Sequence, residues 1–404
     1  MPKKIRLLVR KLSSALRSKS RNILGIVWVI LVDNSAFLSV RNKRLKSKQQ
    51  VFALDLHTSV TRDVSFSLEK SGFRLKRWSI CSSSYLYKEP NLKLRFINSR
   101  NWRDLSSVDI ENFRDKYSNF LEQNDAFLVS YSFSLLRIFA EYKKPILAIN
   151  ATRYESPYTL QESEFNSLNK LISDLYQRNL LMVVSNNKGD MDYLEYFTGV
   201  KSQHIPSLCE YIPEMKGSNG KWVVISRNQD LAKHVASYAS NMHSQYELYP
   251  NGFSHSEFAN NKGVVYIPYN ISTMRLFELA TAGFPIRIPS DRLLMEWIHL
   301  QGVLDELSWV QVAGTSCPIW LKDTPADPEW VDFYKWWLQR ADWHNTTHFP
   351  NVKFFDSLDE LAAEQEYECD MVIRNNEIRK DWQTVTDELF SRSESNFLIV
   401  KKST

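Results

Sequence analysis

A predicted helix start at Ser272 gathers residue types that suit a phosphorylated ligand. Ser272 is a good N-cap residue, the run Thr273 to Ala282 is rich in helix formers, and Gly283 ends it. The unpaired N–H groups of a helix start and the positive end of its dipole attract anions. Arg275 adds a charge there, and Glu278, deeper in the helix, could accept hydrogen bonds from a ribose diol. We therefore predict a donor site for a nucleotide from Asn270, Ser272, Thr273, Arg275 and Glu278.

This segment resembles the donor-binding helix of the GT-B type of glycosyltransferase. In that family a loop of small polar residues precedes a helix with a glutamate, followed by an Ala, Gly and Pro turn and a short apolar strand. Glu278, Ala282, Gly283 and Pro285 match the pattern, with the Ala and Gly adjacent here. The alternative is an ordinary strand–helix–strand unit in which Arg275 and Glu278 pair across one turn.

Two further strand ends carry groups that could act on the same ligand. Arg227 follows the predicted strand Lys221 to Ile225 and is a second candidate for the donor phosphates, or else a solvated loop residue. Asp55 and His57 follow the predicted strand Val51 to Leu56. Imidazole has the near-neutral pKa that a general base needs, and Asp55 could orient it. The alternative has Asp55 or Thr58 capping the next helix, with His57 a bystander.

A polar loop after a further strand supplies candidates for binding the acceptor. These candidates are Asn150, Arg153, Tyr154 and Glu155, and Glu155 could also replace His57 as the base. A Pro-terminated turn is the alternative. The nearby pair Asp190 and Asp192 has the Asp-x-Asp spacing of a metal site, but its place at a probable helix start favours N-terminal capping. We expect neither a metal nor a cofactor.

The coarse pattern predicts an α/β fold. Short apolar runs alternate with helical segments, which indicates mostly parallel sheets. A Pro-, Gly- and Ser-rich stretch at 213–220 reads as a linker, so we expect an acceptor domain over 49–214 and a donor-binding domain over 215–404. The resemblance implies two Rossmann-like domains of the GT-B type facing a cleft, with the last helices packing back across the junction.

The N-terminal arm, residues 1–48, carries 13 basic residues and one acid, whereas the rest of the chain has a net charge of −7. Basic residues flank the apolar run 23–32, so we expect a peripheral element on an anionic membrane surface. Asp33 argues against a span over 23–40, because burying it costs about 3 kcal/mol. Nucleic-acid attachment, which we favour less, and a buried strand remain the alternatives. Four scattered cysteines predict a cytoplasmic protein with reduced thiols.

These observations favour a metal-independent glycosyltransferase at the inner face of a membrane. Its partners would be a nucleotide-sugar donor and a saccharide or lipid-linked acceptor. A sugar-nucleotide epimerase on the same frame is the second enzymatic hypothesis. The third is a non-catalytic scaffold or nucleic-acid binder that acts through the arm. No Walker loop, zinc-protease or serine-hydrolase motif is present in the sequence.

Overall fold

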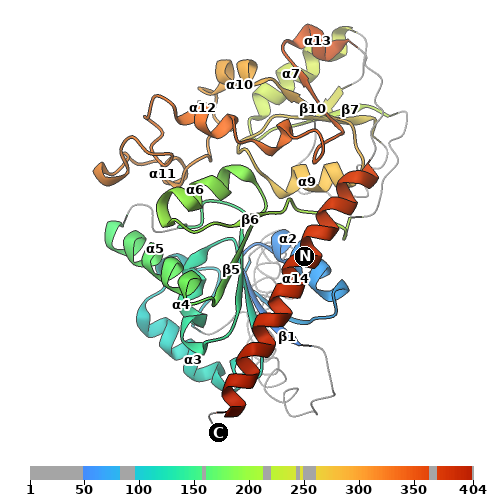
Figure 1. Ribbon diagram of the computed structural model, residues 1–404. Helices are drawn as coiled ribbons and strands as arrows, with labels where there is room; N and C mark the ends of the chain where they lie inside the picture. The colour runs from blue at the N-terminus through green and yellow to red at the C-terminus, as the bar shows by residue number, and fades with distance from the viewer. Residues whose placement is uncertain are drawn as a thin grey trace, which may run out of the picture.

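The computed structural model describes residues 49–81, 96–156, 161–212, 220–242, 246–248, 261–363 and 371–402. The basic arm predicted over 1–48 lies outside these residues, as does most of the predicted linker. The described chain forms two α/β lobes, each built on its own parallel sheet (Figure 1). The predicted α/β class with two Rossmann-like units is confirmed, and the arrangement is the one that the GT-B resemblance implies.

The sheet of the first lobe has the strand order β2-β1-β3-β4-β5-β6, and its pairs are parallel. Four of its strands are apolar runs buried along almost their whole length, as expected of a sheet covered on both faces. Its strands are β1 (Gln50–Asp55), β2 (Arg74–Ser79), β3 (Ala126–Ser130), β4 (Ile146–Asn150), β5 (Leu181–Ser185) and β6 (Gln203–His204).

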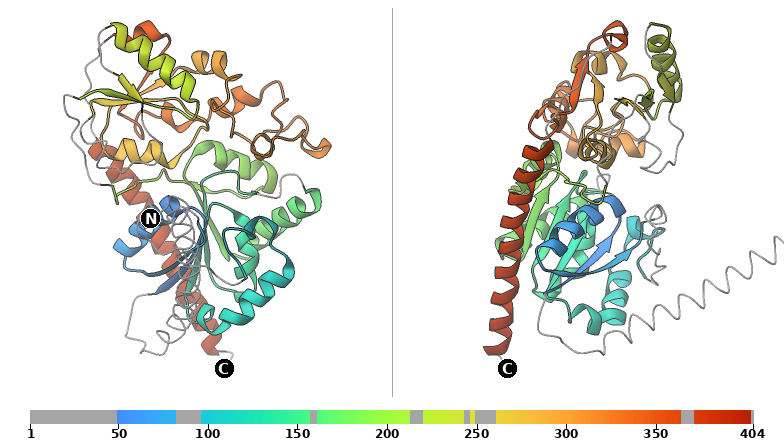
Figure 2. Two further views of the ribbon diagram at one scale, coloured as in Figure 1. Left: turned by 180° about the vertical axis from the view of Figure 1, so that it is seen from behind. Right: turned by 90° about the vertical axis from the view of Figure 1, so that its right-hand side faces the viewer.

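Helices on both faces cover this sheet (Figure 2). They are α2 (Thr58–Lys70), α3 (Ser107–Leu121), α4 (Leu136–Phe139), α5 (Glu162–Gln177) and α6 (Lys188–Thr198), with 3-10 turns η2 (Trp102–Asp104), η3 (Phe133–Leu135) and η4 (Ala140–Tyr142). A capping box between Ser106 and Asp109 starts α3.

The sheet of the second lobe has the order β11-β10-β9-β7-β8. If β7 to β11 are renumbered one to five along the chain, their order, read from the β8 edge, is 2-1-3-4-5. The first five strands of the first sheet have the same order. The strands are β7 (Trp222–Ile225), β8 (Tyr246–Leu248), β9 (Gly263–Tyr266), β10 (Ile286–Pro289) and β11 (Val352–Phe355). The helices that accompany them are α7 (Gln229–Met242), α9 (Met274–Thr281), α10 (Asp291–Trp297) and α13 (Leu358–Ala362).

A Trp-rich segment extends the second lobe beside the first (Figure 1). It contains α11 (Trp309–Ala313), η6 (Ile319–Leu321), α12 (Phe333–Leu338) and η7 (Asp342–His344). The Trp-rich run from Glu329 to Trp343 does not form one long helix. The carboxylate of Asp327 accepts the backbone N–H of Glu329 and holds a turn there, so that the helix starts later and is short.

The last helix, α14 (Met371–Lys402), runs from the second lobe down the side of the first (Figures 1 and 2). Its side chains Ile378, Trp382 and Val385 join the core beneath α2 and the first sheet. The two lobes are therefore joined by a continuous helix as well as by the linker. Among the described residues, the helices lack the combination of length and apolar character that crossing a bilayer requires.

Candidate functional site

Both sheets have a topological switch point, and polar residues follow the strands on either side of each one. In the first lobe β1 pairs with β3, and His57 and Tyr131 lie just beyond their carboxyl ends. In the second lobe β7 pairs with β9, and Arg227 and Tyr269 lie in the equivalent places. In open α/β sheets ligands bind in the crevice at this point, because neighbouring loops diverge there.

The two switch points interact electrostatically across the junction of the lobes. Burial raises the pKa of the Tyr131 phenol, and the nearby groups that act on it include Arg153 from its own lobe. Glu306 and Tyr269 of the second lobe also act on it and raise its pKa further. Side chains from both lobes therefore lie close to one another at this junction.

His57 is partly exposed, and its ring stacks on that of Tyr131, with centroids 5.4 Å apart and planes 24° from parallel. Its Nδ1 atom is buried and has no hydrogen-bond partner in the described part of the protein. Burial lowers the pKa of His57, and the charge of Glu278 only partly offsets this. The imidazole is therefore neutral near pH 7, which is the form a general base needs.

In this structure the Asp55 carboxylate is not bonded to His57 Nδ1, and its role in orienting the ring stays a prediction. Its Oδ1 accepts a 2.7 Å hydrogen bond from Thr61 Oγ1, which lies 2.6 Å from Ser130 Oγ. Burial raises the pKa of Asp55, and its hydrogen bonds to Thr61, Ser79 and the start of α2 oppose that shift. The carboxylate bonds to residues in the first turn of α2, but His57 holds the N-cap position of that helix and no side-chain cap is present there, so capping by Asp55 or Thr58 is not seen.

The start of α9 faces the first lobe (Figure 1), but the first lobe covers it. The N-cap is Thr273 and not Ser272. Thr273 Oγ1 accepts from Leu276 N at 3.3 Å and lies 2.7 Å from the Tyr266 hydroxyl. Ser272 Oγ is buried without a hydrogen-bond partner among the described residues. Ile271 packs closely against Gly189 of α6. A Cβ atom added to Gly189 would lie 2.2 Å from Ile271 Cδ1. In this arrangement the hydroxyls of Ser272 and Thr273 are not open to a phosphate.

Further along α9, the predicted ribose-binding carboxylate is already engaged. Glu278 is buried, and its Oε1 accepts a 2.8 Å hydrogen bond from the hydroxyl of Tyr211. Arg275 Nη1 lies 3.5 Å from Glu278 Oε2, so the pairing across one turn is present. The Arg275 side chain is still 30% exposed. The guanidinium of Arg62, on α2, lies 5.0 Å from the Tyr211 ring. Arg275 thus pairs with Glu278, and Arg62 lies against the Tyr211 ring whose hydroxyl donates to the same carboxylate.

Arg227 is the most exposed of the predicted donor contacts. Its guanidinium lies 3.3 Å from the centroid of the Tyr269 ring and forms an ion pair with Glu306. The side chain is 46% exposed. These two partners fix the guanidinium at the switch point of the second sheet and leave part of it open to solvent. This suits a cation that meets a phosphate group.

The predicted acceptor contacts are buried, because their loop folds inward. Asn150 Nδ2 donates to Ser185 Oγ at 3.0 Å and to the Asp190 carbonyl at 2.7 Å. The Tyr154 hydroxyl donates to Asn169 at 2.6 Å, and Glu155 accepts from Tyr193 at 2.9 Å. Asn150, Tyr154 and Glu155 are buried and bonded within the first lobe in this structure, and their assignment to the acceptor stays a prediction.

Arg153 and Asn270 join the two lobes. Arg153 Nη1 lies 3.3 Å from Asp190 Oδ1 and donates to Asn270 Oδ1 at 3.3 Å. Its guanidinium also lies 5.2 Å from the ring centre of Trp337 on α12. Both residues are buried, so neither is a ligand contact here. Asp190 belongs to the capped start of α6, where Asn187 Oδ1 accepts its N–H, and this agrees with capping at the Asp-x-Asp pair.

Tyr131 and Tyr269 are the site residues that the sequence analysis missed. Each follows a buried apolar strand, but so do several other polar residues. Only the order of the strands shows which of these strand ends flank a switch point. Tyr131 also has φ 74°, a conformation that bulky side chains rarely adopt.

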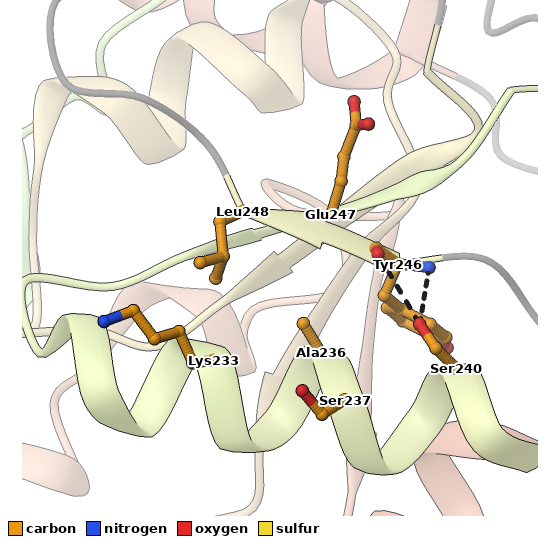
Figure 3. Close-up of a pocket in the computed structure, with 7 residues that line it drawn as sticks. All are labelled: Lys233, Ala236, Ser237, Ser240, Tyr246, Glu247 and Leu248. Carbon is orange, nitrogen blue, oxygen red and sulfur yellow. Dashed lines mark hydrogen bonds between the residues drawn. The ribbon is translucent and has the colours of Figure 1, made fainter.

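A separate cavity of about 380 Å³ lies between α7 and β8, near the edge of the second sheet (Figure 3). Its lining includes Lys233, Ser240 and Tyr246, and the Tyr246 N–H donates to Ser240 Oγ. None of the predicted site residues lines it. This cavity is therefore separate from the strand ends that carry His57 and Arg227.

No family model matches the chain, and no curated protein matches it. Solved structures similar to it include the glycosyltransferase SnogD from Streptomyces nogalater, at 10% identity and TM-score 0.37, covering 89% of this chain and 100% of that one. The calicheamicin glycosyltransferase CalG4 has 8% identity and TM-score 0.35, over 86% and 96% of the two chains. S. aureus MnaA in complex with UDP has 12% identity and TM-score 0.36, over 73% and 91%. Likeness at this level carries no argument about activity, which depends on the chain's own site.

Proposed function

We propose that this chain is a glycosyltransferase that moves a sugar from a nucleotide-sugar donor to a saccharide or lipid-linked acceptor. The observation that carries the proposal is the meeting of two switch points. His57 stands at that of the first sheet, and Arg227 with Tyr269 stands at that of the second. A base and a cation held by separate lobes suit a reaction between two substrates that enter from opposite sides.

The chemistry follows from these groups. His57 accepts the proton of the acceptor hydroxyl while that oxygen bonds to the anomeric carbon of the donor sugar. The bond from the anomeric carbon to the diphosphate breaks, and the diphosphate leaves with the electron pair. Arg227 and Arg275, both partly exposed, meet the charge that develops on it. Glu278 remains the candidate for the ribose and would exchange its bond with Tyr211 for one with the ligand.

The basic arm is the proposed membrane contact. Residues 1–48 carry a net charge of +12, which suits an anionic lipid surface and an acceptor embedded in it. This part of the proposal rests on the sequence alone.

Transfer is tested with the full chain, a panel of nucleotide sugars and a saccharide or lipid-linked acceptor, with the released nucleoside diphosphate as the readout. We expect His57→Gln to lower the turnover by roughly 10²-fold or more while the donor affinity is retained. Donor affinity is measured separately by calorimetry. An unchanged turnover in His57→Gln would remove His57 from the mechanism, and conversion of the sugar without acceptor would indicate an epimerase instead.

A further inference from the structure

Tyr131, whose ring stacks on His57, has an unusual backbone conformation. It directly follows β3 and has φ 74°, in the left-handed region that disfavours bulky side chains. Its N–H donates to the Ile149 carbonyl at 3.3 Å, and the next residue, Ser132, turns back to bond the Ser130 carbonyl at 3.1 Å. The chain therefore makes a tight turn here, and the turn directs the Tyr131 ring onto His57.

No side chain among the described residues bonds to the Nδ1 atom of His57, and the backbone hydrogen bond that acts on the ring is with the residue's own main chain. A catalytic imidazole is commonly held by a hydrogen bond at one nitrogen, which fixes the ring and its tautomer. His57 Nδ1 is buried without such a partner among the described residues, and the Asp55 carboxylate is bonded to Thr61. The aromatic contact that the structure gives the His57 ring is the stack with Tyr131.

We propose that Tyr131 is a positioning residue, whose strained turn holds its ring against one face of the His57 imidazole, fixes the orientation of the imidazole and excludes water from that face. The inference rests on the proposed function only in taking His57 as the base. The contact itself is open to measurement without any substrate.

The charged and titratable groups that face His57 define what the measurement reports. Glu278 of α9 acts on His57 and raises its pKa, Asp55 lies two residues before it on β1, and Tyr131 covers one face. Burial is the largest influence and lowers the pKa. Removing the Tyr131 ring admits water, so the pKa of His57 should move up toward its ordinary value of 6.5.

The test is a proton NMR titration of the full chain, which has eight histidines, with His57 assigned from the spectrum of His57→Gln. Tyr131→Phe keeps the stack, and we expect it to leave the pKa of His57 at the wild-type value. Tyr131→Gly removes the ring and relieves the backbone strain, because glycine readily adopts positive φ. We expect this variant to raise the pKa of His57 and to lower kcat by roughly tenfold or more, with the donor KM unchanged.

Lys143→Gly is the matched control, since Lys143 is exposed and also has positive φ, at 49°. It should relieve strain without altering the pKa of His57. If Tyr131→Gly fails to fold, Tyr131→Asn replaces it, because asparagine tolerates this conformation. The inference is overturned if Tyr131→Gly, or Tyr131→Asn in its place, leaves the pKa of His57 unchanged. It is also overturned if Tyr131→Phe raises that pKa as much as the variant without the ring does. A chain that shows this titration but binds no nucleotide sugar would refute the proposed function and leave the inference standing.

Discussion

The hydroxyl of Tyr211 donates a 2.8 Å hydrogen bond to Oε1 of Glu278, so a residue at the end of the first lobe holds a carboxylate of the second. Arg275 lies 3.5 Å from the other oxygen of the same carboxylate. The charge of Glu278 also reaches His57 and raises its pKa. Glu278 thereby connects the end of the first lobe, α9 and the candidate base, so a change at Glu278 should alter the pKa of His57.

Glu278→Gln should lower the pKa of His57 further, because the substitution removes a negative charge and leaves burial in place. The acidic limb of kcat/KM should move to lower pH by the same amount. NMR titration of His57 and the pH profile measure the two shifts independently. Glu210→Gln, next to Tyr211 in the chain but paired with Lys70 and Arg379, serves as the control and should move neither. A pKa that rises in Glu278→Gln would contradict the electrostatic link.

The corrected cap of α9 gives a paired prediction. Thr273→Ala removes the cap on Leu276 N and the contact with Tyr266, and we expect it to lower the free energy of unfolding by about 1–2 kcal/mol. Ser272→Ala removes a buried hydroxyl that has no partner among the described residues, so it should be neutral or stabilising. Urea unfolding of the two variants compares them directly. A larger loss in Ser272→Ala would restore Ser272 as the cap.

Arg374 of α14 is buried and donates hydrogen bonds to both lobes. It donates to the carbonyls of Ser207 at 2.8 Å and His348 at 2.6 Å, so Arg374→Met leaves both without this donor. We expect a loss of about 3 kcal/mol in the free energy of unfolding. Arg379→Met, one turn further along and half-exposed in its pair with Glu210, should cost less than about 1 kcal/mol. If urea unfolding shows the same loss of free energy of unfolding in Arg374→Met and Arg379→Met, the buried hydrogen bonds of Arg374 contribute no more to stability than the exposed ion pair.

His348 should make the protein less stable in mild acid. Burial, together with the nearby His204, lowers the pKa of His348 from 6.5 to about 4. As the pH falls from 6.5 to 4, the unfolded chain binds a proton here that the folded protein does not, so stability declines across this window. His348→Gln should reduce that decline by about 1 kcal/mol, allowing for the partial exposure of the ring. His299→Gln, at an exposed position, is the control. Parallel curves for wild type and His348→Gln would contradict this.

The fold was predictable where local patterns and tertiary packing agree. The runs at β1, β3, β4 and β5 are apolar except at their ends, which is what strands buried on both faces require. The helix of the donor segment was also predicted, although its cap was misplaced by one residue, because Ser272 and Thr273 are both good caps and only packing against Tyr266 selects Thr273.

The site was harder to predict, because it depends on which strands are neighbours. The loop after β4 has the polar composition of a binding loop, yet Asn150, Tyr154 and Glu155 bond to buried partners that come from α5, α6 and β5. In contrast, Tyr131 lies in a sequence without a motif, and its importance follows from the pairing of β1 with β3. The sequence shows which residues are polar, but the order of the strands in the sheet determines which polar residues lie next to each other at a switch point.

The most direct test of the account is whether a nucleoside diphosphate or its sugar binds between Arg227 and Arg275. We expect at least one of a panel of these ligands to raise the unfolding temperature of the full chain, with a gain of about 2.7 kcal/mol at a ligand concentration 100 times the Kd. Calorimetry should show roughly tenfold weaker binding in Arg227→Gln and Arg275→Gln, and unchanged binding in Arg292→Gln, whose side chain is exposed on α10 and paired with Glu296. A panel in which no ligand stabilises the protein, or equal affinity in all three variants, would contradict the central claim.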